Sequence, residues 1–392
     1  MAYTPVYPEG IDRAAYEKAL ESCVMGGGWL FNQSSMDVWF DFDGFVVKIP
    51  AGTKVRPDGW ENIRSLVEQR HTEKIYGQAY PVSRSGFQFV SNHLVNVFDS
   101  LVVFSPDSAR HWSILYGQPQ RSLEEHIALI NGMGLDRVTV VAEDLSFLSR
   151  CPGLRHLHIV HAETTVKPLD FSPVYTLLDL ESIEIQSSAT PAGKGPAIRI
   201  DLSRLTGLRD VRVWSNDPYN YHLLPRLDRL SIGSDKRHRD MTNISCSPSL
   251  MDLDLEWCGT RTLDGIGRYP LQRLTLLYLR RLEDISALSG CAYTLRSLSI
   301  EGCNKITDFS CLHRLHNLEI LYLKGGQVLP DLSFLENMPR LRVFIFSMTV
   351  ENGDLTPCLD VPYVYCSKIK RHYNLKDKDL PRDKDAFGFE LI

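Results

Sequence analysis

The stretch Leu250-Met-Asp-Leu253-Asp-Leu255 carries an apolar pattern, Leu-x-x-Leu-x-Leu, that returns along more than half of the chain. Ile, Val or Phe replaces Leu at the later positions of some copies. The ten copies are Leu135/Val138/Val140, Leu154/Leu157/Ile159, Leu180/Ile183/Ile185, Leu208/Val211/Val213, Leu227/Leu230/Ile232, Leu250/Leu253/Leu255, Leu271/Leu274/Leu276, Leu295/Leu298/Ile300, Leu318/Leu321/Leu323 and Leu341/Phe344/Phe346. Their first leucines lie about 23 residues apart on average, inside the range of about 20–29 residues for one strand and its return. This spacing predicts a solenoid.

Each copy alternates apolar with polar residues, which is typical of a half-buried strand. Between the strands lie segments that place two further apolar residues at a spacing suited to a helical or 3₁₀ turn. They are residues 144–148, 201–205, 284–288, 308–312 and 331–335, of which Asp284-Ile-Ser-Ala-Leu288 is representative. We expect the strands to stack in parallel and these segments to close the opposite side over the core.

Residues 135 to about 366 resemble the leucine-rich repeat family, and the segments between the strands are similar to those of the short-repeat, internalin-like bacterial group. The resemblance implies an α/β solenoid, a horseshoe with a parallel sheet on its concave side. The family places Asn or Cys after the strand to hold the turn, and Asn216, Cys258 and Cys303 stand there. Other copies have other residues, Asp235 among them, so we expect an irregular curvature.

Outside the repeats, Ser122-Leu-Glu-Glu125 has the form of a capping box that opens a helix through about Gly132. We expect three parts: residues 1–120 as a small α+β module of no recognised family, residues 121–366 as the leucine-rich repeat domain with a capping helix and a degenerate last repeat, and residues 367–392 as a polar, solvated extension. The predicted elements of the module are helices at residues 12–22 and 58–72, a hairpin of residues 38–42 and 45–49, and strands at residues 88–90, 95–98 and 100–104.

Composition narrows the classes of function. A formal charge of −5 and a pI near 6.2 give no basic excess, so net charge does not favour nucleic acid or anionic membranes. The N-terminus lacks the pattern of a signal peptide and no run of about 18 apolar residues occurs, so we expect a cytoplasmic, bacterial protein. The nine cysteines are scattered without a Cys-x-x-Cys pair, which favours reduced, buried thiols.

Several groups of residues have a chemical interpretation that is weaker than the structural one. In the cluster of His156, His158 and His161, the first two face the same side of one strand and could share a metal, but no third ligand lies nearby and a closed zinc site needs four. Residues 252–263 do not form a calcium loop, because Trp257 stands where Gly is needed. The remaining candidates are Gly193-Lys194-Gly195 as a phosphate loop, Asp41 and Asp43 as paired carboxylates, Cys23 as a nucleophile and Lys236-Arg-His-Arg239 as a basic patch. We expect the last of these, residues 236–239, to be a solvated loop. We therefore expect no catalytic residue, metal or cofactor.

The polar residues between the apolar ones face the concave side, where this family generally binds. The residues expected to bind a partner are Asp210, Arg212, Trp214, Arg229, Asp252, Asp254, Glu256, Arg273, Tyr322 and Lys324. Aromatic and arginine side chains are enriched at protein interfaces. The sequence thus predicts a cytosolic module that binds a partner protein, with a regulatory or toxin-immunity protein as its narrowest version, and without a nucleic-acid, membrane or small-molecule partner. The alternative is an enzyme in which residues 1–120 are catalytic and the repeats recognise the substrate.

Overall fold

The computed structural model describes residues 3–7, 10–26, 29–42, 45–49, 54–55, 88–90, 93–95, 101–104, 122–141, 144–161, 169–187, 200–214, 219–383 and 386. The chain divides into a first unit, residues 1–199 with residue 392, and a second unit, residues 200–391. No helix in the described ranges is long and apolar enough to cross a membrane.

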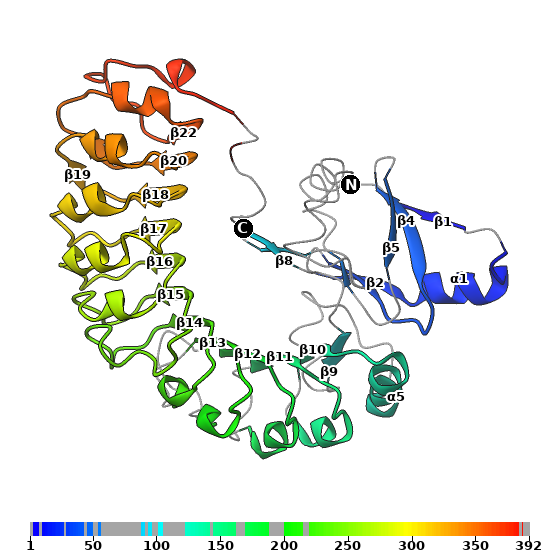
Figure 1. Cartoon of the computed structure of the whole chain (residues 1–392). Coiled ribbons are helices and arrows are strands. Elements are labelled where there is room, and N and C mark those ends of the chain that lie inside the picture. Colours follow the sequence, from blue (N-terminus) through cyan, green and yellow to red (C-terminus); the bar gives the residue numbers. More distant parts are fainter. Residues whose placement is uncertain are drawn as a thin grey trace. The chain divides into compact units, whose positions relative to one another are not determined.

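The second unit is built from short parallel strands that pair with their neighbours in chain order. These strands are β13 (Asp210–Trp214), β14 (Arg229–Gly233), β15 (Asp252–Glu256), β16 (Arg273–Leu277), β17 (Ser297–Glu301), β18 (Ile320–Lys324), β20 (Val343–Phe346) and β22 (Tyr363–Cys366). A small parallel pair, β19 (Val328–Leu329) and β21 (Thr349–Val350), lies beside them in the chain. The stacked strands confirm the predicted α/β solenoid of leucine-rich repeats (Figure 1).

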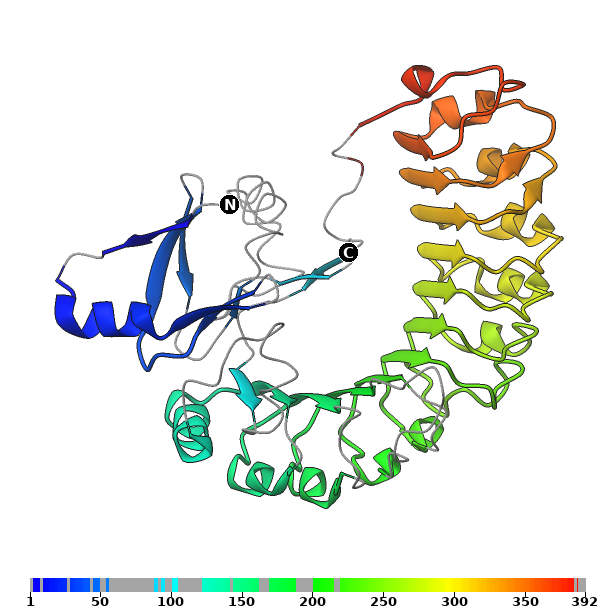
Figure 2. The ribbon, with the colours of Figure 1, turned by 180° about the vertical axis from the view of Figure 1, so that it is seen from behind.

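Short 3₁₀ helices lie on the side of the second unit away from the strands, as Figure 2 shows from behind. They are η4 (Leu202–Arg204), η5 (Tyr221–Leu223), η6 (Ile266–Arg268), η7 (Ser286–Cys291), η8 (Ser310–Arg314), η9 (Ser333–Asn337) and η10 (Thr356–Asp360). Another 3₁₀ helix, η11 (Asp377–Asp379), follows β22 in the chain. Several begin with the same contact, in which an Asp carboxylate accepts the backbone N–H two residues later. Asp284, Asp308 and Asp331 each accept that bond at 2.8 Å. The side chain thus fixes the turn that starts the helix.

All thirty residues of the repeated apolar pattern are buried, none being more than 8% exposed. The strands project them to one side of the sheet and the alternate residues to the other, since side chains alternate along a strand. Burying each of these side chains contributes roughly 1.5–3 kcal/mol before chain entropy is subtracted. The predicted core is therefore confirmed residue by residue.

The first unit contains the start of the repeats. Strands β9 (Leu101–Phe104), β10 (Arg137–Val141), β11 (His156–His161) and β12 (Ser182–Ser187) are parallel neighbours, with the 3₁₀ helices η2 (Ser146–Arg150) and η3 (Ser172–Thr176) between them in the chain. Helix α5 (Leu123–Met133) has the predicted capping box, because Ser122 and Glu125 each bond the other's backbone. The sequence places the strand at residues 100–104 in the N-terminal module, but β9 pairs with β10 and so belongs to the repeat sheet.

The described part of the N-terminal module agrees with the predicted helix and hairpin. Helix α1 (Arg13–Glu21) starts at Asp12, whose carboxylate accepts two backbone N–H groups. Strands β1 (Tyr3–Val6), β4 (Val38–Phe42) and β5 (Phe45–Ile49) form an antiparallel sheet. Strands β2 (Cys23–Gly26), β3 (Trp29–Asn32) and β6 (Lys54–Val55) form another, and β7 (Gln88–Val90) pairs with β8 (His93–Val95). The predicted helix at 58–72 and residues 96–98 lie outside the described residues.

Residues 350–366 form the predicted degenerate last repeat, since β22 pairs in parallel with β20. The segment that follows is not the solvated extension we expected. Tyr373 is 3% exposed and its hydroxyl accepts the backbone N–H of Val350 at 3.0 Å, while Leu380 is 4% exposed. Apolar residues spaced among the charges thus let this segment cover the end of the core.

Candidate functional site

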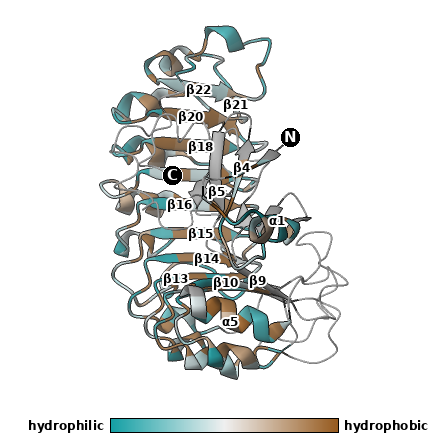
Figure 3. Ribbon diagram, turned by 90° about the vertical axis from the view of Figure 1, so that its right-hand side faces the viewer, coloured by the Kyte–Doolittle hydropathy of each residue, from teal (hydrophilic) through white to brown (hydrophobic). Residues whose placement is uncertain are grey.

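The outward side of the second unit's sheet is a continuous surface that we call the strand face. The strand register aligns its residues in three rows. Row one is Asp210, Arg229, Asp252, Arg273, Ser297, Ile320, Val343 and Tyr363. Row two is Arg212, Ser231, Asp254, Thr275, Ser299, Tyr322, Ile345 and Tyr365. Row three is Trp214, Gly233, Glu256, Leu277, Glu301 and Lys324. All ten predicted binding residues lie on this face. Figure 3 shows hydrophilic and hydrophobic residues alternating along the strands.

Row one begins with a chain of opposite charges. The Asp252 carboxylate lies between Arg229 Nε at 3.1 Å and Arg273 Nε at 3.3 Å, and its side chain is only 17% exposed. Burial raises the pKa of Asp252 and the carboxylates of Asp254 and Asp210 raise it further, against the lowering by the two arginines. The two arginines therefore do not fully compensate the loss of water around this carboxylate.

Asp254 lies in the next row on the same strand. Burial raises its pKa, and the nearby Asp210 carboxylate adds to the rise, although a hydrogen bond from Thr275 and the charge of Arg212 oppose it. Arg212 itself lies 3.6 Å from Asp210. A cation brought to this point from another molecule would favour the ionised carboxyls, because an opposite charge nearby stabilises the charged form.

Trp214, the predicted aromatic anchor, is half-buried and its ring lies over Gly233 on the adjacent strand. A Cβ atom at Gly233 would fall 1.8 Å from Trp214 Cδ1, a distance that no side chain can share. Glycine at this register position is therefore required for the ring to lie where it does. At the other end of row three, Lys324 Nζ lies 3.9 Å from Glu301 Oε2 and 5.7 Å from the centre of the Tyr322 ring.

A pair of stacked aromatic residues borders row three, and the sequence analysis does not predict it. Trp257 and Tyr278 immediately follow β15 and β16, and their rings stack with centres 4.7 Å apart at 18°. Trp257 is 41% exposed and its Nε1 donates to Glu256 at 3.0 Å. The Tyr278 hydroxyl donates to Glu301 at 2.8 Å, and the Arg280 guanidinium lies 4.8 Å from the Trp257 ring. We call Trp257 and Tyr278 the aromatic pair.

The backbone of the aromatic pair is left-handed, with φ of 55° at Trp257 and 54° at Tyr278. Ser234 and Gly302 take the same conformation after β14 and β17. In each case the backbone N–H still bonds the next strand, as from Trp257 to Leu277 at 3.0 Å. Bulky residues rarely adopt positive φ. In the sequence, Trp257 was considered only as a missing glycine in a calcium loop, and nothing local marks its conformation.

Two of the residues that follow these left-handed positions hold the turns from inside. The thiols of Cys258 and Cys303 are buried and lie 3.4–3.6 Å from backbone carbonyl oxygens. Burial raises the pKa of the Cys258 thiol to about 12, so it is not a reactive group. These two cysteines thus take the turn position that the resemblance implied, whereas Asn216 lies outside the described residues.

Asp235 takes the corresponding place after β14 and organises the loop we expected to be solvated. It is 2% exposed and accepts hydrogen bonds from Tyr221 Oη at 2.9 Å and from Arg237 Nη2 at 2.6 Å, with His238 Nδ1 at 3.3 Å. Burial disfavours its charge, but the bonds from His238 and Arg237 outweigh burial and hold the pKa of Asp235 well below its ordinary value. The predicted solvated loop is nevertheless confirmed, since Lys236, Arg237 and Arg239 are exposed and only the aspartate at its base is buried.

The other candidates from the sequence do not converge on one another. His156 and His158 lie on β11 in the first unit, with His158 Nε2 3.7 Å from Glu184 and its Nδ1 3.5 Å from Thr139 Oγ1. Within the described ranges, no three His, Cys, Asp or Glu side chains gather as a metal site would require. Cys23 Sγ lies 3.5 Å from the Ala19 carbonyl oxygen. Asp43 and residues 193–195 lie outside the described residues.

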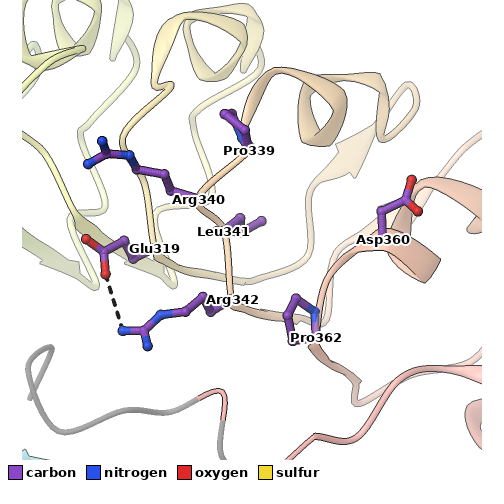
Figure 4. A pocket seen from close by; sticks show the side chains of 7 residues that line it. All are labelled: Glu319, Pro339, Arg340, Leu341, Arg342, Asp360 and Pro362. Atoms are coloured by element: carbon purple, nitrogen blue, oxygen red, sulfur yellow. Dashed lines mark hydrogen bonds and ion pairs between the residues drawn. The ribbon is translucent and has the colours of Figure 1, made fainter.

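An open pocket lies at the opposite ends of the last strands, just before β18, β20 and β22. It is lined by Glu319, Pro339, Arg340, Leu341, Arg342, Asp360 and Pro362 (Figure 4). Within the pocket, the Glu319 carboxylate pairs with Arg342 Nη2 at 3.3 Å and with Arg296 Nε at 3.7 Å. These ion pairs tie three successive repeats together along one rim, which is a structural role.

No protein-family model matches the chain. No curated protein matches its sequence. Among solved structures it is similar to the internalin InlF of Listeria monocytogenes, with 16% identity and a TM-score of 0.47 over 79% of this chain and 90% of that one. It is also similar to the functional domain of InlJ from Listeria monocytogenes (13%, TM-score 0.37, 70% and 65%) and to a leucine-rich repeat protein of Leptospira interrogans (15%, TM-score 0.36, 60% and 56%). At such identities the likeness concerns the fold alone, and the leucine-rich repeat character of the chain rests on its own buried pattern and parallel strands.

Proposed function

We propose that the chain is a binding protein whose strand face, from β13 to β17, holds a partner protein against the aromatic pair. The observation that carries the proposal is the aromatic pair itself. Two large rings are held at the border of a polar face in a backbone conformation that costs about 1–2 kcal/mol for residues other than glycine. Strained backbone that presents an exposed side chain is characteristic of functional sites.

The charges beside the pair support a partner that brings its own cation. Asp252 and Asp254 are poorly hydrated carboxyls with raised pKa values on β15, the strand that Trp257 directly follows. A lysine or arginine from a partner would lie between these carboxyls and the rings, gaining from both charge and the ring faces. Exposed aromatic residues next to partly desolvated charges make up the centre of many protein interfaces.

On this proposal the protein is not an enzyme and works in the cytoplasm, with a regulatory or toxin-immunity role as its narrowest form. Nucleic acid, membrane and small molecules are not its partners. The ten predicted binding residues contribute unequally: Asp254 and Glu256 next to the pair matter most, and the mutually paired Arg229 and Arg273 mainly set the position of Asp252.

Capture of partners from a lysate of the source cells by the tagged protein tests the proposal. The double variant Trp257→Ala/Asp254→Lys should lose the captured partner, with at least tenfold weaker binding of the purified partner. Tyr293→Ala is the matched control, because Tyr293 is an 83% exposed aromatic residue that follows η7, a 3₁₀ helix opposite the strands. Equal capture by wild type and the double variant would show that the strand face at β15 is not the binding surface.

A further inference from the structure

The strand face changes character between β17 and β18. In rows one and two, the pair on β17 is Ser297 and Ser299, whereas β18 carries Ile320 and Tyr322. The following strands continue with Val343 and Ile345 and then with Tyr363 and Tyr365. We call these six residues the apolar end of the strand face. Outward positions on a solenoid sheet are ordinarily solvated, so a run of six apolar and aromatic residues there calls for a covering group.

The chain covers this end with its own C-terminal residues. Ile320 is 5% and Val343 is 0% exposed, although both point outward, and Ala386 packs against them in one cluster with Tyr322, Ile345 and Tyr363 around it. Residues 381–383 lie beside β22 and are bonded to it. The Val364 N–H donates to the Pro381 oxygen at 3.0 Å, and the Asp383 N–H donates to the Pro362 oxygen at 3.0 Å. We call Pro381–Asp383 together with Ala386 the strap.

The strap binds as an extended peptide would. Arg382 pairs with Tyr363 in antiparallel fashion, and its guanidinium lies 5.8 Å from the Tyr363 ring centre and 5.5 Å from that of Tyr365. Its Nη2 also donates to Asp377 at 2.5 Å. Four residues later Ala386, 5% exposed, fills the space over Ile320 and Val343. The apolar end of the strand face thus contacts three features of the strap. They are an extended backbone, an arginine beside two tyrosines, and a small apolar residue four positions after the arginine.

We propose that the apolar end of the strand face is a second binding site, specific for an extended protein segment with an arginine followed four residues later by a small apolar residue. The strap occupies this site in cis, and a partner segment of the same chemistry displaces it. Among the described residues, the strap is held by two backbone hydrogen bonds to the end of β22, by the Arg382 side chain and by Ala386. These are the kind of contacts that a competing peptide reproduces one for one. The site is separate from the β13–β17 surface, and its test does not depend on the function proposed for that surface.

The test uses a fluorescent peptide with the sequence of residues 380–387 and the full chain. Wild type should bind it weakly, because the strap competes. The variant Arg382→Ala/Ala386→Asp weakens the strap and should bind the peptide at least tenfold more tightly. A peptide with Ala in place of its arginine is the matched control and should bind neither protein. Adding Ile345→Asp to the strap variant should abolish binding, since it places a carboxylate in the apolar end. Equal affinity of wild type and the strap variant, both folded by circular dichroism, would overturn the proposal.

Hydrogen exchange on wild type gives a second measurement that needs no variant. At saturating peptide the Asp383 amide should lose protection, because the strap leaves, while the Val364 amide should keep it, because the peptide replaces the Pro381 oxygen. Protection of Asp383 that does not change with peptide would count against displacement. A concentration-dependent dimer that Arg382→Ala abolishes would show that the strap is exchanged between copies, and would overturn its occupancy in cis.

Discussion

Trp257 illustrates at the scale of one residue how side chain and backbone oppose each other. Its φ of 55° suits glycine or asparagine, and its ring gains by stacking on Tyr278 and by the hydrogen bond to Glu256. A left-handed residue other than glycine costs about 1–2 kcal/mol, whereas an aromatic pair contributes about 0.5–1.5 kcal/mol beyond its buried area. The cost of the backbone and the gain from stacking nearly cancel, which leaves the buried part of the ring and its hydrogen bond to Glu256 as further contributions.

Replacing Trp257 by glycine and by valine separates these terms. Trp257→Gly should leave the free energy of unfolding within about 1 kcal/mol of wild type, because relief of backbone strain offsets the lost ring contacts. Trp257→Val should destabilise by about 2–3 kcal/mol, since a β-branched residue loses the contacts and worsens the strain. Equilibrium urea unfolding measures both. Indistinguishable stabilities for the two variants would mean that the backbone at this position relaxes without cost.

At the scale of an element, the loop from Ser234 to Arg239 is ordered by one buried carboxylate. Asp235 joins Tyr221 from η5 to Arg237 and His238 of its own loop. Burial and the adjacent negative charge raise the pKa of Tyr221, so this hydroxyl remains a donor to Asp235. The charged loop is thus tied to the preceding repeat through its most buried member.

Asp235→Ala should destabilise the protein by about 3 kcal/mol, because it leaves buried donors without an acceptor. Asp240→Ala is the control, since Asp240 is only partly buried and bonds the N–H and hydroxyl of Thr242; a loss of about 1 kcal/mol is expected there. The folded-state pKa of Asp235 is lowered, so its contribution is full above the unfolded pKa near 4 and is lost as pH falls through the still lower folded pKa. Unfolding at pH 7 and at pH 3 should therefore show a smaller difference between wild type and variant at pH 3. An equal difference at both would contradict the pKa assignment.

At the scale of the whole molecule, stability is passed from repeat to repeat, because each repeat contacts mainly its neighbours. Leu253 is fully buried in β15, with β14 and β16 as its neighbours.

Leu253→Asp should therefore cost more than about 4 kcal/mol, by burying an unpaired charge, and hydrogen exchange should show lost protection in β14, β15 and β16 first. Ser299→Asp on the outward face of β17 is the control and should change stability by less than about 0.5 kcal/mol. Uniform loss of protection across all strands of the second unit would instead indicate a single cooperative core.

The repeats could be predicted from sequence because the pattern that identifies them is also the pattern that is buried. The burial of Leu253 and Leu255 can be read from two properties of the sequence, the alternation of apolar and polar residues and the regular spacing of the copies. The capping box at Ser122 and the outward position of Asp252 follow from the same local rules. The side of the sheet on which these strand residues lie could therefore be predicted from the sequence.

The features that could not be predicted from the sequence depend on contacts between residues distant in the chain. Positive φ at Trp257 and Tyr278 results from the bonds that their N–H groups make to the next strand. The burial of Asp235 requires Tyr221 from the preceding repeat. Ile320 appears in the sequence as an apolar residue in an outward position, but only the structure shows that Ala386 covers it. Each of these features belongs to the packing between repeats, which a periodic pattern does not encode.

The strap has a further consequence for how the molecule behaves in a crowded solution. β22 is the last strand of the second unit's sheet, and an outermost strand offers unpaired backbone groups on which another chain can add, leading to aggregation. The bonds from Val364 to Pro381 and from Asp383 to Pro362 occupy that edge, and Pro381 has no N–H of its own to offer. The strap thus leaves fewer backbone groups of this edge open to pairing with another chain.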